Sequence, residues 1–184
     1  MTTVNGYRIE PGAQLSRANL PKTSLIVADL TGANLASANL SGADLLGANL
    51  SLTDMSGAHL PLARLAGAYL PLSNLRGADL RRALLRDANL AWVDLTGADL
   101  SEAWLERADL SGATLNRATL SKARLIGARL IEARLCAANL RQADLRGADL
   151  RDCDLTGADL RGANLRGARL AGARLPDGTR QKSV

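Results

Sequence analysis

The feature that most constrains this chain is a leucine at every fifth position. From Leu15 to Leu175, all 33 consecutive fifth positions are Leu except Met55. If that position is called i, position i−2 is Ala in 28 of the 33 repeats, and position i−1 is Asp in 11 and Asn in 8. An α-helix turns about 100° per residue, so a five-residue period would scatter the leucines around the helix axis. The period therefore excludes an amphipathic helix.

A very short β-strand fits each repeat better. Positions i−2, i−1 and i alternate in, out, in, as a pleated strand requires, whereas i+1 and i+2 are mostly polar or Gly. All five prolines fall at i+1 and 15 of the 17 glycines at i+2, which are the second and third residues of a β-turn. We therefore predict short strands joined by corners, with Ala and Leu inside. Corners without Gly at i+2, such as those at Leu52, Arg82 and Trp92, are expected to adopt a second turn geometry.

The repeats resemble those of a known family. Segments 43–47 (ADLLG), 98–102 (ADLSE) and 148–152 (ADLRD) are similar to the A(D/N)LXX consensus of pentapeptide-repeat proteins. The resemblance implies an all-β fold, a right-handed quadrilateral parallel β-helix of about 8 coils, each made of four pentads. It covers residues 13–177, so that residues 1–12 form an N-terminal cap and residues 178–184 a short polar tail.

The sequence itself supports a circuit of four pentads. Under that circuit, residues four pentads apart would stack in adjacent coils about 4.8 Å apart, where opposite charges are favourable. Three arginines at i−1 are each followed four pentads later by an aspartate, namely Arg124, Arg129 and Arg134 by Asp144, Asp149 and Asp154. The exceptional inward residues Thr53, Ser73 and Val93 are also spaced four pentads apart.

Both ends of such a rod are open sheet edges that need covering. Val4, Tyr7 and Ile9 are expected to fold over the first coil. The polar C-terminal tail has no helix signal, whereas the resemblance implies relatives that dimerise through a C-terminal helix. The last coil is therefore expected either to be loosely capped or to pair end to end with a second copy in a homodimer.

The residues offer little for catalysis, and no enzyme activity is expected. His59 is the only histidine, and it takes an outward position without a nucleophile beside it. Cys153 replaces an inward Ala and Cys136 is at i+1, so a disulfide or a shared metal is not expected. The aspartates at i−1 recur throughout the chain and favour a solvated, charged face. We predict no catalytic, cofactor or metal site and no small-molecule substrate.

The composition also bears on location. No run of about 18 apolar residues appears, and the first residues lack the pattern of a secretory signal, so no membrane span is expected. Only two cysteines are present, which favours a reducing, cytoplasmic setting.

Outward apolar residues mark two candidate partner-binding groups. The first is Leu52, Leu72 and Trp92, which share one column at i+2, with Tyr69 close by. The second is Leu62, Leu84 and Trp104 around another corner. Exposed apolar clusters can mark contact surfaces. Alternatively, these side chains only shield the corners, and Trp104 only forms a cation–π contact with Arg124.

These observations favour a non-enzymatic rod that presents a rigid protein-binding or scaffolding surface to an unidentified protein partner. The resemblance offers an alternative, because some relatives modulate or protect type II topoisomerase (DNA gyrase) as acidic DNA mimics. Duplex DNA carries one charge per roughly 1.7 Å, whereas this chain has a net charge of +5. The charge balance therefore disfavours DNA mimicry. For the late arginines, at most a weak, salt-sensitive association with nucleic acid is expected.

Overall fold

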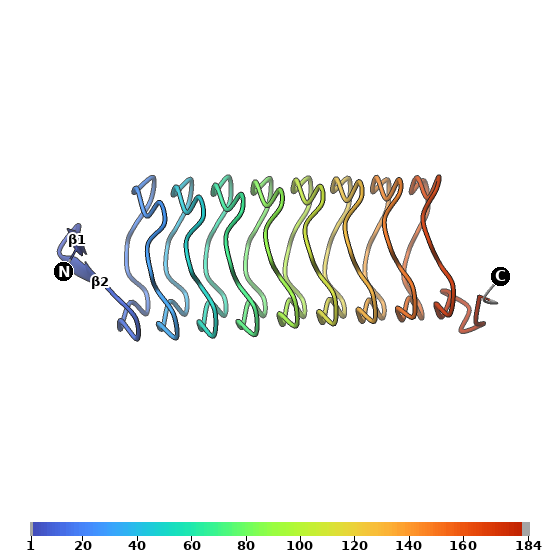
Figure 1. The fold of residues 1–184 in the computed structure, drawn as a ribbon, viewed down its shortest axis with the longest axis horizontal. Coiled ribbons are helices and arrows are strands. Elements are labelled where there is room, and N and C mark those ends of the chain that lie inside the picture. The colour runs from blue at the N-terminus through green and yellow to red at the C-terminus, as the bar shows by residue number, and fades with distance from the viewer. Residues whose placement is uncertain (1, 182–184) are drawn as a thin grey trace.

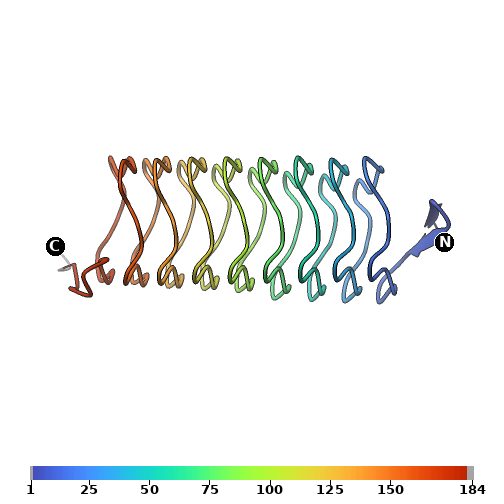
Figure 2. The ribbon, with the colours of Figure 1, turned by 180° about the vertical axis from the view of Figure 1, so that it is seen from behind.

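The computed structural model describes residues 2–181, which form a straight rod of stacked coils with a small hairpin at the N-terminal end (Figure 1; Figure 2 shows the opposite side). Between Gln14 and Arg174, 29 parallel bridges each pair residues 20 positions apart, such as Asn34 with Asp54. Each coil is therefore one circuit of four pentads. The quadrilateral parallel β-helix expected from the sequence is confirmed.

The four sides of the rod are named by the strand that each contributes to the first coil. Faces 1, 2, 3 and 4 begin with residues 13–15, 18–20, 23–25 and 28–30, and each continues with every twentieth residue. A corner takes the numbers of the faces that it joins, so residues 51–52 belong to corner 4/1. Corners 1/2, 2/3 and 3/4 follow in the same way.

Backbone hydrogen bonds between coils hold each strand at two points. The N–H of a residue at i donates to the i−1 carbonyl of the next coil, as from Leu50 to Tyr69 at 2.7 Å. The N–H of a residue at i−1 donates to the i−2 carbonyl of the previous coil, as from Tyr69 to Ala48 at 2.9 Å. This ladder fixes the register at four pentads per coil, because a slip would move the inward side chains outside.

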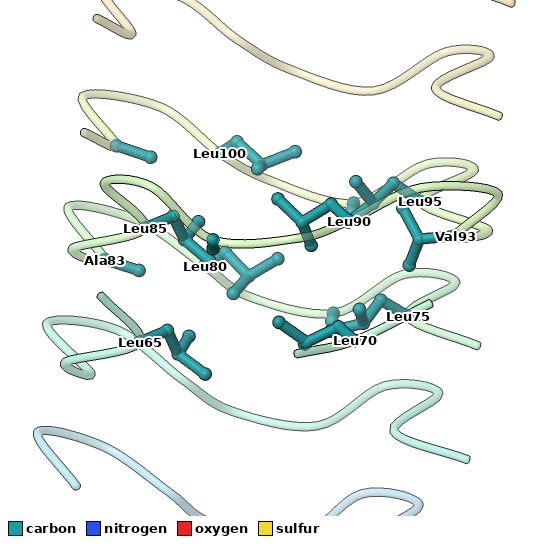
Figure 3. Close-up of a cluster of buried hydrophobic side chains, with 14 of the residues drawn as sticks. Leu65, Leu70, Leu75, Leu80, Ala83, Leu85, Leu90, Val93, Leu95 and Leu100 are labelled. Atoms are coloured by element: carbon teal, nitrogen blue, oxygen red, sulfur yellow. The ribbon is translucent and has the colours of Figure 1, made fainter. Parts of the chain in front are cut away.

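The core is a stack of small and aliphatic side chains. From Leu30 to Leu155, every residue at i−2 and i is at most 2% exposed. Figure 3 shows the leucines of successive coils, such as Leu70 and Leu90, facing the rod interior together with Val93. Burying one leucine contributes roughly 1.5–3 kcal/mol, and the alanines keep the narrow interior from overfilling.

The exceptional inward residues occupy one column of face 1, as their spacing predicted. The hydroxyls of Thr53 and Ser73 are buried, and they donate to the carbonyls of Leu50 and Leu70 at 2.6 and 2.7 Å. Both hydroxyls are therefore satisfied without a partner in the core.

The prediction of two corner geometries was wrong. Every residue at i+2 from 12 to 172 has a positive φ, between 49° and 60° for residues other than Gly and between 61° and 74° for Gly. The reason is that the corner belongs to the ladder. The N–H at i+2 donates to the i+1 carbonyl of the next coil, as from Trp92 to Ser111 at 2.9 Å. The ladder imposes one shape, although a left-handed residue other than Gly costs about 1–2 kcal/mol.

The stacked arginines and aspartates are in the predicted register, but the three arginines named above do not form ion pairs with the aspartates that follow them in their columns. Arg124, Arg129 and Arg134 are the bridge partners of Asp144, Asp149 and Asp154. Asp144 and Asp149 instead pair with the arginines two positions after them, Arg146 and Arg151, both at 2.7 Å. An arginine at i+1 reaches back to the aspartate of its own strand, and its side chain donates twice to that carboxylate. Other column pairs do form, such as Asp149–Arg169 at 3.3 Å, Asp44–Arg64 at 2.8 Å and Asp87–Arg107 at 2.7 Å.

An antiparallel hairpin lies at the N-terminal end of the rod. Strands β1 (Thr2–Val4) and β2 (Tyr7–Ile9) are joined by Asn5 and Gly6, which both have positive φ, as a two-residue hairpin turn requires. Ile9 is buried, and Val4 and Tyr7 pack partly against the core. The Asn19 N–H donates to the Tyr7 hydroxyl at 3.3 Å, so the hairpin satisfies one amide of the first coil.

The C-terminal segment folds back on one face of the last coil. Leu175 N–H donates to the Thr179 carbonyl, and Gln181 N–H donates to the Ala173 carbonyl. This pairing covers the edge of face 1 only. On the other three faces of the last coil, Leu160, Leu165 and Leu170 remain half-buried.

Candidate protein-binding surface

Three large apolar side chains occupy corner 4/1 in three successive coils. Leu52, Leu72 and Trp92 are 59%, 62% and 60% exposed, and each has a φ of 59°. Tyr69, 48% exposed, lies on face 4 three residues before Leu72. The fold therefore places the first candidate group along one edge of the rod. We call these four residues the apolar ridge.

The ridge ends where the ring of Trp92 lies over Gly112. A Cβ atom at Gly112 would be 2.4 Å from Trp92 Cε3 and 2.6 Å from two further ring atoms. Other corner side chains lie over the next coil in the same way, such as Lys22 over Gly42 and Val27 over Gly47. Side chains at i+2 thus lean toward the C-terminal end of the rod, and the indole rests on the backbone of the glycine that follows in its column.

Polar groups border the ridge on both sides. On face 4, Asn49 and Asn89 accept the N–H groups of their own corners. On face 1, Asp54 accepts from Asn74 at 3.0 Å, and Asp94 pairs with an arginine at the same distance. The ridge is therefore an apolar strip within a polar rim.

The second candidate group is less exposed and is divided. Leu84 and Trp104 pair on face 3, but Leu84 is half-buried and Trp104 is only 37% exposed. Leu62 lies at corner 2/3 beside a shallow hollow of about 320 Å³, which is also bordered by Arg81 and Arg82. The structure therefore does not make one apolar surface of these three residues.

Trp104 belongs to an ionic cluster. Arg86 and Arg124 place their guanidinium carbons 4.6 and 4.7 Å from the centre of its ring. Glu106, whose side chain is 7% exposed, accepts from Arg86 at 3.1 and 3.2 Å and pairs with Arg124 at 2.8 Å. The expected cation–π contact between Trp104 and Arg124 is present, and Arg86 forms a second one that the sequence pattern did not reveal. Glu106 was missed too, although an acid at i+1 between two arginine-bearing coils could have signalled it.

Another apolar cluster was missed at the N-terminal end. Ile26, Val27 and Leu46 are all exposed at corner 3/4 in two neighbouring coils. Ile26 and Val27 also border a hollow of about 310 Å³ that Val4 and Ile9 of the hairpin line. A search for apolar residues at the corner positions of neighbouring coils, which identified the ridge, would also have identified these three residues.

The exposed apolar residues share one part of the rod. Within residues 2–181, every exposed large hydrophobic residue lies between Ile26 and Trp104. The corners of the C-terminal coils are mostly polar or charged, and their isoleucines, Ile126 and Ile131, are half-buried. The rod therefore has an apolar-cornered half and a polar half.

The carboxylates of the strands are engaged in structural bonds. The side chains of Asp and Asn at i−1 accept the N–H at i+1, as Asp99 does from Ser101 at 2.9 Å. Where i+1 is Arg, its hydrogen bonds hold the pKa of the aspartate below its usual range, as for Asp79 and Asp144. These groups are stabilised as ions, which is unlike the raised pKa that a general acid needs.

The remaining reactive groups are isolated. His59 is exposed on face 2, and Cys153 is buried, where loss of hydration raises its thiol pKa to about 12. Burial also raises the pKa of the half-buried Cys136 thiol. Among residues 2–181, no group of three or more His, Cys, Asp or Glu side chains is arranged to hold a metal ion.

The part of the chain that the structure describes contains no helix long and apolar enough to span a bilayer.

The pentad pattern matches a known family. The family profile described as pentapeptide repeats matches in eight copies, over residues 12–47, 33–70, 63–102, 73–112, 105–142 and 138–177. No curated protein matches the chain.

Several solved structures are similar. HetL of the cyanobacterium Nostoc sp. strain PCC 7120, a pentapeptide repeat protein involved in heterocyst differentiation regulation, is 32% identical, with 95% of this chain and 94% of HetL covered and a TM-score of 0.42. A pentapeptide repeat protein of the Arabidopsis thaliana thylakoid lumen is 36% identical over 53% of this chain and 65% of its own, with a TM-score of 0.45. QnrB1, a plasmid-mediated fluoroquinolone resistance protein, is 23% identical over 82% of this chain and 91% of its own, with a TM-score of 0.37.

Proposed function

This chain belongs to the pentapeptide repeat family, whose fold is the right-handed quadrilateral β-helix, and we propose that it is a rigid rod that binds a protein partner through the apolar ridge. The observation that carries the proposal is the ridge itself. Three large apolar side chains line one corner in consecutive coils and remain about 60% exposed.

Folding alone does not account for these residues. A left-handed residue other than Gly costs about 1–2 kcal/mol, and leucine or tryptophan at such a corner leaves most of its apolar surface in water. Glycine, which occupies 15 corners of this rod, avoids both costs. The backbone strain is shared by every corner without Gly, so the exposed apolar surface of the ridge is what supports a functional role.

The ridge also has the composition of an interaction surface. Tyr and Trp are enriched among residues that dominate binding energy, and a polar rim that excludes water surrounds such residues. Trp92 and Tyr69 supply the aromatic groups, while Asn49, Asn89 and Asp54 supply the rim. The partner is expected to offer an apolar groove that accepts a convex edge.

A rigid rod suits this role, because its surface is ordered before binding. The core beneath the ridge is fully buried and the backbone is bonded to both neighbouring coils. Association therefore orders few groups beyond the ridge side chains, which lowers its entropic cost.

The test is a quantitative pull-down from the source cells with the wild-type chain, Leu72→Arg and Leu62→Arg. The two substitutions are matched, since both replace an exposed leucine (62% and 54%) at nearly the same φ (59° and 60°), but on different corners. The proposal expects a protein that is lost with Leu72→Arg and retained with Leu62→Arg. Equal retention by all three proteins would reject the ridge.

Modulation of a type II topoisomerase has weaker support. The likeness to QnrB1, at 23% identity, indicates the fold alone. Several of the aspartates that a DNA mimic would present are instead paired with the arginine two residues on, as in Asp79–Arg81 and Asp159–Arg161. A gyrase supercoiling assay with and without a fluoroquinolone tests this role, which protection at micromolar protein would support.

A further inference from the structure

The positive charge of this chain is concentrated in the C-terminal coils. Residues 113–184 contain 14 Lys and Arg against 7 Asp and Glu, whereas residues 1–112 contain 9 against 11. The net charge of +5 therefore originates in the half of the rod that lacks exposed apolar corners.

The surplus also lies on one side of the rod. The C-terminal parts of faces 2 and 3 with their corners, residues 117–127, 137–147 and 157–167, carry seven cations and two acids. The opposite side, residues 128–136, 148–156 and 168–176, carries five cations and four acids. We call the seven cations the basic surface: Arg117, Lys122, Arg124, Arg141, Arg146, Arg161 and Arg166.

Arg124 is paired with the buried Glu106 at 2.8 Å, and the two acids within the basic surface do not neutralise the other six cations. Asp144 pairs with Arg146, while Asp159 pairs with Arg161 and, at 3.6 Å, with Arg141. The carboxylates are 27% exposed, whereas the three arginine side chains are 48–75% exposed. A guanidinium has five N–H donors, so a bidentate carboxylate leaves three for another ligand.

We propose that the basic surface binds the phosphate backbone of duplex nucleic acid without reading its sequence. Six of the seven cations are arginines, whose planar fork matches a phosphate group. Successive coils present these cations at intervals of about 4.8 Å on a straight, rigid face. This binding uses a different part of the rod from the apolar ridge and does not depend on it.

The same surface is poorly suited to single strands. Proteins that bind single-stranded nucleic acid stack its bases on exposed aromatic side chains. Between residues 105 and 181, no exposed large hydrophobic residue is found, and Trp104 is flanked by Arg86 and Arg124. Contacts are therefore limited to the backbone, which a duplex presents on its outside.

The expected affinity is low and strongly dependent on salt. If four or five of the cations neutralise phosphates, log K falls with log salt with a slope of about −4. Raising salt from 50 to 200 mM would then weaken binding ~250-fold. The dissociation constant at physiological salt is expected in the non-specific range of about 10⁻⁴–10⁻⁶ M.

The test is the fluorescence anisotropy of a labelled 20-base-pair DNA duplex titrated with the full chain at 25–200 mM salt. The test variant is Arg141→Gln/Arg161→Gln and its matched control is Arg129→Gln/Arg169→Gln. Each removes two arginines that pair with aspartates, but the control pair lies on face 4. The test variant should reduce the salt slope by about 2 and weaken binding at least tenfold at 50 mM, while the control stays within about twofold of wild type.

Several results would overturn the proposal. These are no binding at 25 mM salt, equal weakening by both double variants, or tighter binding of a single strand of the same length. A poly-glutamate peptide that displaces the duplex at lower charge concentration would instead assign the surface to an acidic protein. If a double variant melts below the assay temperature, the single variants Arg161→Gln and Arg169→Gln provide the same comparison.

Discussion

Replacing Gly112 by Ala tests how the apolar ridge is built. A Cβ atom at this position would lie 2.4–2.6 Å from three ring atoms of Trp92, so the indole ring must move away from the backbone of residue 112. Gly97→Ala is the matched control, since Gly97 has nearly the same φ (68° against 66°) and an added Cβ atom there would meet nothing within 4 Å. Both variants share the backbone cost of about 1–2 kcal/mol, which is partly offset by ~0.4–1 kcal/mol from the stiffer unfolded chain. Only Gly112→Ala also displaces Trp92.

The difference between the two variants follows from the contact that Trp92 loses. The side chain is 60% exposed, so roughly 80 Å² of an aromatic side chain of about 200 Å² is covered. At ~25 cal/mol per Å², covering this surface contributes about 2 kcal/mol in total, and the contact with Gly112 is part of it. Losing half or all of it makes Gly112→Ala less stable than Gly97→Ala by about 1–2 kcal/mol, or ~2–8 °C in melting temperature.

Thermal melting and acrylamide quenching of tryptophan fluorescence measure both effects. The two tryptophans are Trp92 and Trp104, so both variants are made in a Trp104→Phe background to isolate Trp92. Quenching should increase in Gly112→Ala and stay unchanged in Gly97→Ala. Identical melting temperatures and identical quenching of the two variants would refute the packing of the Trp92 ring on the backbone of Gly112.

Three further perturbations test the core, the ionic cluster and the strand carboxylates. Ala108→Leu places three extra carbons at a fully buried position, so overpacking should destabilise the rod by about 1–3 kcal/mol; an unchanged melting temperature would count against the interior assignment. Glu106→Gln removes the charge that holds two arginines beside Trp104, and should change tryptophan emission while costing only ~1 kcal/mol because both arginines are about 40% exposed. Arginine hydrogen bonds lower the folded-state pKa of Asp144 and Asp149 below 3.8, so their stabilisation is complete above that pH and is lost as pH falls through the lower folded values. The melting temperature should drop between pH 4 and pH 2, and a flat profile would contradict this account.

The fold follows from the sequence because one pattern specifies both the interior and the circuit. The alternation of Ala, a polar residue and Leu predicts a strand, and the two residues that follow predict a corner. The spacing of Thr53, Ser73 and Val93 further indicates coils of four pentads. Repetition makes this inference strong, since each coil restates the same local preference.

The corner geometry did not follow from local preference. Leu52 or Trp92 in isolation avoids positive φ, which predicted a second turn type. The ladder overrides this preference, because the corner amide must donate to the next coil. A single-residue rule cannot include a hydrogen bond to a residue in another coil.

The ion pairs and the site were only partly predictable for a similar reason. Column spacing correctly predicts which residues stack, but side-chain reach decides which charges meet. Asp144 therefore forms its ion pair with Arg146, two residues further along the chain, while Arg124 forms its ion pair with Glu106 of the previous coil. The spacing of the columns predicts which residues form the ridge. The contact between the Trp92 ring and Gly112 could not be predicted in this way, because it depends on the direction in which the corner side chains point.

The most direct test of the account is a distance between spin labels along one corner column. Lys22→Cys and Gln142→Cys place labels at two exposed corner 2/3 positions that are 24 pentads apart, with Cys136→Ser and Cys153→Ala removing the native thiols. Circuits of four pentads put six coils between the labels, or about 29 Å at about 4.8 Å per coil. A circuit of three pentads would put eight coils between them, or about 38 Å. A pulsed electron resonance distance of about 29 Å is the predicted result, and a distance of about 38 Å would contradict the four-sided coil on which the ridge and the basic surface depend.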